Sequence, residues 1–306
     1  MTAEETPASS TDDALTQAQT TTEALEWHAP VLVRIDEHTT IPHLLKERVQ
    51  RGATRPLILR KIGIGDTWRS ITAREFYDEV HALAAGLIAR GLAPGDRVAI
   101  MSRTRYEWTL LDFACWAAGL VPVPIYETSS IDQVAHVLVD ADVHLIITET
   151  VSMAEIVRAA ADREHRDNTH VFSLDSEAIE TLIAEGSATP RESILARSEA
   201  LTKDDIATIV YTSGTTGTPK GTVLSHENFT NLCLNAHAWM PEIAAGKNSR
   251  LLLFLPLAHV FARFLQVFQI SGNGVLGHAS NIKNLLNDLA SFKPSYLLVV
   301  PRVLEK

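Results

Sequence analysis

The residues best suited to chemistry lie in one stretch, Tyr211 to Gly221, with the sequence Tyr-Thr-Ser-Gly-Thr-Thr-Gly-Thr-Pro-Lys-Gly. Its glycines allow successive backbone N–H groups to turn toward one anion. The hydroxyl side chains add hydrogen-bond donors, and Lys220 adds a compact positive charge that suits phosphate. These properties predict a loop that binds phosphate groups. The alternatives are a Ser/Thr/Gly-rich turn without a ligand and, for Lys220, a solvated surface lysine.

The spacing of this stretch excludes two common nucleotide motifs. The Walker motif needs a glycine, four further residues and then Gly-Lys-Ser/Thr, but here Gly221 follows Lys220. The dinucleotide fingerprint needs a tighter set of glycines, whereas Gly214, Gly217 and Gly221 are spaced by three and four residues. The loop therefore belongs to another class of phosphate site.

The elements around the loop must position it. Apolar runs over 206–210 and 222–224 predict a strand on each side of the loop. Before it, continuously apolar strands alternate with amphipathic helices, which predicts an α/β fold with a mostly parallel sheet covered by helices on both faces. The expected helices cover 41–50, 72–90, 104–118, 130–140 and 153–161, and the expected strands cover 56–60, 67–71, 98–101, 121–126, 143–148 and 170–174.

Three of these helices carry start signals of the capping-box type, a Ser or Thr followed three residues later by Glu or Gln. They begin at Thr72, Thr104 and Ser130. After the loop we expect helices over 225–240, 258–270 and 281–291 and strands over 250–255 and 296–300. The polar segment 186–199 is interpreted as a connector, and residues 1–26 as a disordered tail.

Composition restricts the class of protein. The chain has 306 residues, 46% hydrophobic and 21% charged, which is ordinary for a globular protein. Its net charge is −10, which argues against nucleic-acid binding. Cys115 and Cys233 lie far apart in apolar contexts, which is typical of reduced core cysteines. The expected location is therefore the cytoplasm.

One apolar segment, Leu251 to Ile270, approaches the length of a membrane span. Pro256, His259 and Arg263 interrupt it, and an arginine near the middle would be costly in lipid. A strand, a turn and an amphipathic helix explain the segment better, and peripheral contact at the inner membrane face is left open.

Three further residues are candidates for function. His259 precedes the helix over 258–270 and is either a ligand contact or a core histidine or helix cap. Arg263 follows four residues later on the same helix face, where a structural salt bridge is the alternative. For His226, next to Ser225, a helix-capping role is favoured.

The glycine-rich loop resembles the signature loop of the adenylate-forming superfamily, which includes acyl-CoA synthetases, luciferases and peptide-synthetase adenylation domains. Segments 67–72, 91–99 and 116–124 also resemble the front half of acyl-CoA synthetases. Leu255 to Arg263 and Val300 to Lys306 are similar to the long-chain fatty acyl-CoA synthetases of bacteria. The resemblance covers nearly all of the chain after the tail.

The resemblance implies a ligase that uses ATP, Mg²⁺ and CoA with a long-chain fatty acid. The fatty carboxylate attacks the α-phosphorus of ATP, and the CoA thiol then displaces AMP. In this family the loop holds the β- and γ-phosphates, its first hydroxyl (here Thr212) helps to hold Mg²⁺, and His259 lies near the carboxylate. His259 and Lys220 are then the expected catalytic residues. The implied nucleotide-binding residues are Thr212, Ser213, Gly214, Thr215, Thr216, Gly217, Thr218 and Lys220.

The chain departs from the family in length. The family's later motifs for adenine and ribose, and its small lid domain with a catalytic lysine, are absent after Lys306. We therefore expect residues 27–306 to form part of the large N-terminal domain of the adenylate-forming fold, incomplete at the C-terminus and inactive alone. Two alternatives remain open: an acyl-AMP ligase that loads a carrier protein, and a non-catalytic module that binds nucleotide or acyl groups.

Overall fold

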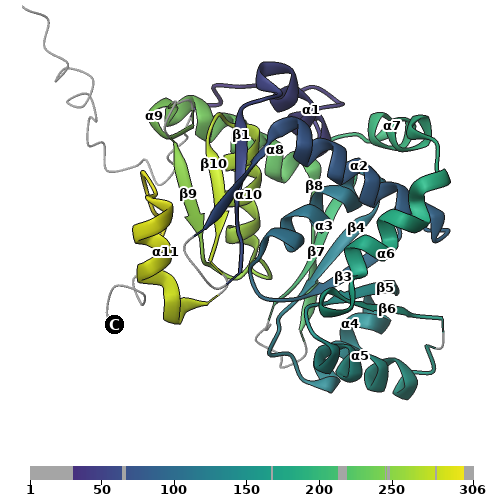
Figure 1. Ribbon diagram of the computed structural model, residues 1–306. Coiled ribbons are helices and arrows are strands. Elements are labelled where there is room, and N and C mark those ends of the chain that lie inside the picture. Colours follow the sequence, from purple (N-terminus) through teal and green to yellow (C-terminus); the bar gives the residue numbers. More distant parts are fainter. Residues whose placement is uncertain are drawn as a thin grey trace, which may run out of the picture. The chain divides into compact units, whose positions relative to one another are not determined.

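The computed structural model describes residues 30–63, 67–166, 168–212, 219–244, 246, 249–279 and 281–299. By its internal contacts the chain divides into two units, Met1–Val31 and Leu32–Lys306, and the fold below is that of the second unit (Figure 1). The expected tail over 1–26 and the segment 300–306 lie outside the described residues.

A parallel sheet of four strands forms the first half of this unit. Its order is β4 (Val121–Ile125), β3 (Arg97–Met101), β5 (Val143–Thr148) and β6 (His170–Ser173). Side chains alternate along β3: Val98 and Ile100 join the large core cluster, whereas Ala99 and Met101 face a second cluster. Helices α2 (Ala73–Ala89) and α3 (Tyr106–Ala117) contribute to the first cluster, and α4 (Ile131–Asp140) and α5 (Val151–Arg163) to the second. Both faces of the sheet are therefore covered, as predicted (Figure 1).

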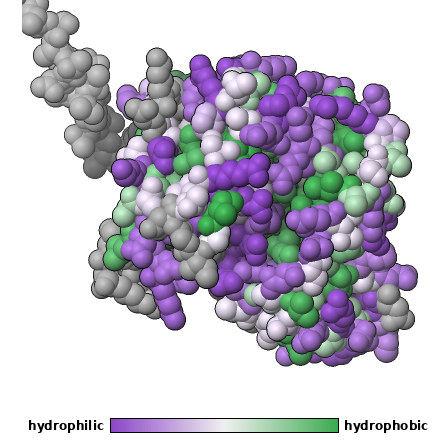
Figure 2. Space-filling view, in the orientation of Figure 1, coloured by the Kyte–Doolittle hydropathy of each residue, from purple (hydrophilic) through white to green (hydrophobic). Residues whose placement is uncertain are grey.

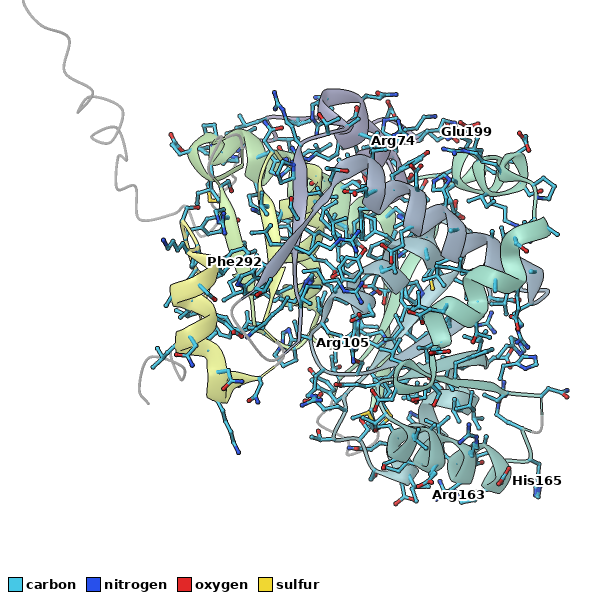
Figure 3. The ribbon with its side chains drawn as sticks, in the orientation of Figure 1. Arg74, Arg105, Arg163, His165, Glu199 and Phe292 are labelled. Atoms are coloured by element: carbon cyan, nitrogen blue, oxygen red, sulfur yellow. The ribbon has the colours of Figure 1, made fainter. Side chains whose placement is uncertain are left out.

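A second sheet mixes strand directions. Its order is β2 (Trp68–Thr72), β1 (Pro56–Lys61), β10 (Val275–His278) and β9 (Arg250–Leu253). Strands β1 and β2, both expected from the sequence, form an antiparallel pair, while β10 runs parallel to both β1 and β9. Gly277 is needed here because a Cβ would lie 2.3 Å from the ring of Phe292, which is labelled in Figure 3. Because glycine has no Cβ, α11 (Leu285–Phe292) can pack against β10 at this position.

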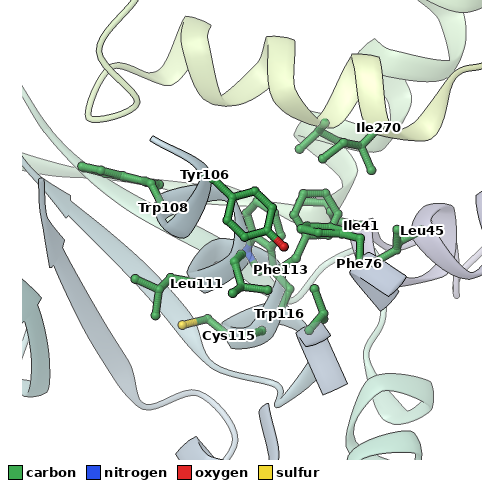
Figure 4. Packing of buried hydrophobic residues seen from close by; sticks show 14 of the residues in the cluster. Ile41, Leu45, Phe76, Tyr106, Trp108, Leu111, Phe113, Cys115, Trp116 and Ile270 are labelled. Atoms are coloured by element: carbon green, nitrogen blue, oxygen red, sulfur yellow. The ribbon is translucent and has the colours of Figure 1, made fainter. Parts of the chain in front are cut away.

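Helix α3 lies at the centre of the large core. All twelve of its residues are buried, including Trp108 and Trp116 at 0% exposure (Figure 4). Phe113 packs edge-on against Trp116 with ring centroids 5.1 Å apart. The indole N–H of Trp116 donates to the carbonyl of Ala207 at 2.7 Å, so this large ring is buried without an unsatisfied donor. Full burial of each such apolar side chain contributes about 1.5–3 kcal/mol.

Local signals account for most helix starts. Thr72 and Ser130 form the expected capping boxes with Glu75 and Gln133. Ser225 caps α8 (His226–Trp239) in the same way. The helices not yet given are α1 (Ile41–Gly52), α6 (Ala178–Glu185), α7 (Arg191–Ala200), α9 (Pro241–Ala244) and α10 (Val260–Ser271), with 3₁₀ turns at Leu174–Ser176, Gly186–Ala188 and Ile282–Asn284.

The prediction that Thr104 caps α3 was wrong. The helix begins after Arg105 and has no side-chain cap. The Thr104 hydroxyl instead donates to the carbonyl of Leu255 at 2.7 Å and accepts the N–H of Leu257 at 3.1 Å. The hydroxyl that the capping-box pattern assigned to the helix start therefore bonds the segment between β9 and α10 instead.

Two other expectations changed in detail. The strand predicted over 296–300 is reduced, in its described part, to one parallel bridge between Tyr296 and Leu251. The segment 186–199, interpreted as a connector, includes the turn Gly186–Ala188 and most of α7.

The segment Leu251 to Ile270 forms β9, a turn and most of α10, as its polar interruptions predict. Among the described residues, none of the helices has both the length and the apolar content to cross a membrane. The face shown in Figure 2 is mostly hydrophilic, with hydrophobic residues in small separate areas.

Candidate active site

The glycine-rich loop joins two paired strands. Strand β7 (Ile206–Thr212) and strand β8 (Lys220–Ser225) run antiparallel, and Thr212 is the direct partner of Lys220. Directly opposed residues of an antiparallel pair project from the same face. The hydroxyl of Thr212 and the ammonium of Lys220 therefore lie on one side of the hairpin, and both residues are exposed. The six expected loop residues between them, Ser213 to Thr218, lie outside the described residues.

Helix α4 holds both ends of the loop. The Tyr211 hydroxyl donates to the Asp140 carboxylate at 2.6 Å. One turn earlier on α4, Nε2 of His136 donates to the carbonyl of Pro219 at 2.8 Å, and its ring packs edge-on against Tyr211. Burial, followed by the bond to Asp140, raises the pKa of the Tyr211 hydroxyl, which keeps it a donor. These contacts attach the hairpin to α4, one of the helices that cover the parallel sheet.

Sequence reasoning did not identify His136 and Asp140. They lie on an ordinary amphipathic helix, and no spacing relates them to a loop more than 70 residues later. The one available signal is that His136 and Asp140 are polar residues four positions apart, which places them on the same face of α4.

A cavity of about 580 Å³ opens beside this hairpin. Its walls come from the end of β4 and the segment after it, from α4, from the end of β7 and from the start of α10. The lining residues are Pro124, Ile125, Tyr126, Ser129, Gln133, Val137, Val210, Tyr211, Thr212, Pro219, His259 and Val260. Thr212 and His259, separated by 46 residues of chain, thus line one space at the carboxyl end of a parallel strand, where open α/β sheets usually bind ligands.

His259 is both a helix cap and a cavity residue. Its Nδ1 accepts the backbone N–H of Phe261 at 3.3 Å and so caps α10. This bond requires a lone pair on Nδ1, so the neutral ring carries its proton on Nε2. The imidazole is exposed, and its Nε2–H is the group available to a ligand. Both alternatives weighed from the sequence, cap and ligand contact, are compatible with this position.

Lys220, Arg263 and His226 occupy three different settings. Lys220 is exposed at the hairpin and is not part of the cavity wall. Arg263 is fully buried and forms an ion pair with Asp112, so its salt-bridge alternative is confirmed. His226 is buried, and its Nδ1 accepts the N–H of Ile41 at the start of α1. It therefore caps a helix other than its own.

The fit of the described residues to a nucleotide and Mg²⁺ is partial. Thr212 offers one oxygen for a metal ion, and Lys220 on the same face offers a charge for phosphate. Within the residues that the structure describes, His, Cys, Asp and Glu side chains form no group of three or more that could hold a metal.

Comparison with known proteins identifies the family of this chain. A family model described as AMP-binding enzyme matches residues 45–306. The long-chain-fatty-acid–CoA ligase FadD15 of Mycobacterium bovis is 39% identical over 283 residues, which cover 92% of this chain and 47% of that protein. The long-chain-fatty-acid–CoA ligase ACSBG2 of Rattus norvegicus is 30% identical over 300 residues, covering 90% and 44%. The chain spans about half the length of these curated relatives.

Solved structures show the same fold. A fatty acyl CoA synthetase of Mycobacterium tuberculosis superposes with a TM-score of 0.73 at 24% identity, over 88% of this chain and 51% of that one. The protein VinN in complex with 3-methylaspartate superposes with a TM-score of 0.71 at 18% identity, over 87% of this chain and 67% of that one. The expected α/β fold is confirmed. Because the family model covers most of the sequence, this chain belongs to the AMP-binding enzyme family.

Proposed function

We propose that the whole protein is a long-chain fatty acid–CoA ligase that forms AMP. The observation that carries this proposal is the single cavity that Thr212 and His259 share, beside the hairpin face that bears Lys220. Such a site can receive the phosphate end of one substrate and the carboxylate of another. The similarity to relatives named long-chain-fatty-acid–CoA ligases supports the choice of substrates.

The proposed reaction has two steps. First, a carboxylate oxygen of the fatty acid bonds to the α-phosphorus of ATP, and the bond from that phosphorus to the bridging oxygen breaks, releasing pyrophosphate. Second, the CoA thiolate sulfur attacks the acyl carbon, and AMP leaves with the electron pair of the broken carbon–oxygen bond. Negative charge is concentrated in the first step, so positioning and electrostatic stabilisation by donors and cations dominate it.

We assign roles to three residues. Lys220 stabilises the charge that builds on the leaving pyrophosphate, together with the backbone of the loop. Thr212 would help to hold Mg²⁺, which would supply positive charge to offset the charge of the phosphates. His259 uses its Nε2–H to orient the fatty carboxylate rather than to transfer a proton. The loop residues from Ser213 to Thr218 complete the contacts to the β- and γ-phosphates in this proposal.

We also place the reaction in the cytoplasm, supported by two free, buried cysteines, Cys115 and Cys233. Burial raises the pKa of both thiols, so they are inert core groups rather than nucleophiles.

The test measures AMP and pyrophosphate released by the whole protein from ATP, CoA and a C16 fatty acid. We expect both products in equal amounts, dependent on the fatty acid and Mg²⁺. A parallel reaction replaces CoA with a phosphopantetheinylated carrier protein. Transfer to the carrier but not to CoA would contradict the choice of acceptor alone, whereas a lack of pyrophosphate in both reactions would contradict the ligase function.

A further inference from the structure

A buried polar cluster lies one helical turn beyond the candidate active site and outside its lining. Arg263 of α10 and Asp112 of α3 are both 0% exposed. The guanidinium Nε donates to one carboxylate oxygen at 3.2 Å and Nη2 donates to the other at 2.6 Å. A buried ion pair often adds little net stability compared with apolar side chains of the same size, because both charges lose their hydration. Stability alone therefore does not explain this pair.

The Asp112 carboxylate is fixed from a second side. Gln266, one turn further along α10, donates its amide N–H to Asp112 at 2.5 Å. The Thr109 hydroxyl donates in turn to the Gln266 amide oxygen at 2.8 Å. Burial raises the pKa of the Asp112 carboxyl, and the facing Arg263 guanidinium opposes that increase. The Arg263 guanidinium carbon lies 5.6 Å from the centroid of the Trp116 ring. Together with the two bonds to Asp112, this contact holds the guanidinium in one orientation.

The remaining contact of Arg263 reaches the strand of the active site. Its Nη1 donates to the hydroxyl of Thr208 in β7, and that hydroxyl donates to the carbonyl of Pro122 in β4 at 2.7 Å. Thr208 lies four residues before Thr212 on the same strand. At the other end, the backbone N–H of Arg263 donates to the carbonyl of His259 at 3.3 Å. Arg263 therefore connects the strand that ends at Thr212, through its guanidinium, with the helix that His259 caps, through its backbone.

We propose that Arg263 is a positioning residue for adenylation: it fixes the spacing of Thr212 and His259 across the cavity, and Asp112 holds it in place. This inference rests on the proposed function, in which Thr212 serves the phosphates and His259 the carboxylate. The two reacting atoms must approach to about 3–3.5 Å in the right orientation, so a small shift of β7 against α10 slows the step that joins them. The chain between these two elements is long, and the Arg263–Thr208 bond is a direct connection that bypasses it.

The test compares two substitutions of the same kind within this cluster. Thr208→Val in the whole protein keeps the side-chain shape and the Asp112–Arg263 pair, but it removes the hydroxyl that connects Arg263 to β7. Thr109→Val is the matched control. Thr109 is also a 0% exposed threonine of the same cluster, but its hydroxyl bonds Gln266 and His278 rather than Arg263. The two variants therefore differ in the connection to the active-site strand.

The readouts are fatty-acid-dependent ATP–pyrophosphate exchange and thermal unfolding. We expect Thr208→Val to lower kcat about tenfold and to change KM for ATP and for the fatty acid less than about threefold, because each half of the site still binds its own substrate. Thr109→Val should keep kcat within about twofold at a similar loss of thermal stability. Thr208→Ser, which restores the hydroxyl, should restore kcat.

Each outcome decides for or against the proposal. Equal losses of kcat in Thr208→Val and Thr109→Val, or a Thr208→Ser variant as slow as Thr208→Val, would overturn it while leaving the ligase function intact. If Thr208→Val does not fold, Thr208→Cys replaces the hydroxyl with a weaker acceptor, and an unchanged kcat would again overturn the proposal. A wild-type protein without any exchange would overturn the proposed function and this inference together.

Discussion

Two histidines at two helix starts make the same hydrogen bond in opposite environments. Nδ1 of His226 at the start of α8 accepts the N–H of Ile41, and Nδ1 of His259 before α10 accepts the N–H of Phe261, both at 3.3 Å. His226 is 1% exposed, whereas His259 is exposed and lines the cavity. An identical contact is therefore structural in one place and leaves a free ring edge for a ligand in the other. Burial, rather than residue type, separates the two roles.

Helix α10 shows the same difference in burial within one turn, between exposed His259 and buried Arg263. The largest effect is expected at the buried Asp112–Arg263 pair. Asp112→Asn leaves the Arg263 charge uncompensated in the core, so the free energy of unfolding should fall by about 3–5 kcal/mol. Urea denaturation of this chain measures it. The control is Glu199→Gln, which removes an exposed ion pair with Lys46 and should cost less than about 1 kcal/mol. Similar losses in both variants would contradict the contrast.

Substitution of the exposed Lys220 should change enzymatic activity rather than stability. Lys220→Ala removes a charge from the hairpin face without touching the core, so we expect adenylation by the whole protein to slow about 100-fold. The midpoint of thermal unfolding should stay nearly constant, because Lys220 is exposed. Lys283→Ala, at another exposed lysine away from the hairpin, is the matched control and should keep full activity. Equal pyrophosphate release from both variants would rule out the assigned role of Lys220.

Because His226 is buried, the free energy of unfolding should depend on pH. Burial lowers its pKa to about 4 from an ordinary value of 6.5, so the folded chain favours the neutral ring. Its contribution to stability is therefore fully present above about pH 6.5 and is lost as the pH falls toward 4. Between pH 7 and pH 4.5 this loss amounts to about 2 kcal/mol. His226→Asn keeps an acceptor in the place of Nδ1 but does not titrate.

The measurement is urea unfolding of wild type and His226→Asn across that pH range. Other groups also titrate there, including His278, whose pKa burial lowers to about 4. The informative quantity is therefore the difference between the two proteins. A difference that stays constant with pH would contradict the structural role of a neutral His226.

The same substitution at His259 gives the smallest effect. Asparagine is a good N-cap, so His259→Asn should preserve α10 and leave the free energy of unfolding within about 0.5 kcal/mol of wild type. It removes the Nε2–H, and we expect adenylation to slow about tenfold. The experiment pairs pyrophosphate release with urea unfolding. Full activity in this variant would assign His259 to helix capping alone.

Much of the fold could be predicted because its signals are local. The capping boxes at Thr72 and Ser130 and the continuously apolar strands depend on neighbours in sequence, and the structure confirms them. The wrong cap at Thr104 shows the limit: its hydroxyl bonds Leu255 and Leu257, about 150 residues away. A local pattern carries no information about such partners.

The candidate site divides in the same way. The loop and His259 could be selected as candidates because glycine spacing, hydroxyls and a polar residue in an apolar segment are visible in sequence. His136 and Asp140, which hold the loop, and the Asp112–Arg263 pair could not be connected with it, because each contact joins distant elements. Only the fold brings these partners together.

The central claim is that the hairpin and His259 form one adenylating site. The most direct test measures ATP–pyrophosphate exchange by the whole protein, with and without a C16 fatty acid and without CoA. We expect exchange that requires the fatty acid, because the proposed first step does not involve CoA. Exchange that is absent, or that proceeds equally without the fatty acid, would contradict the claim.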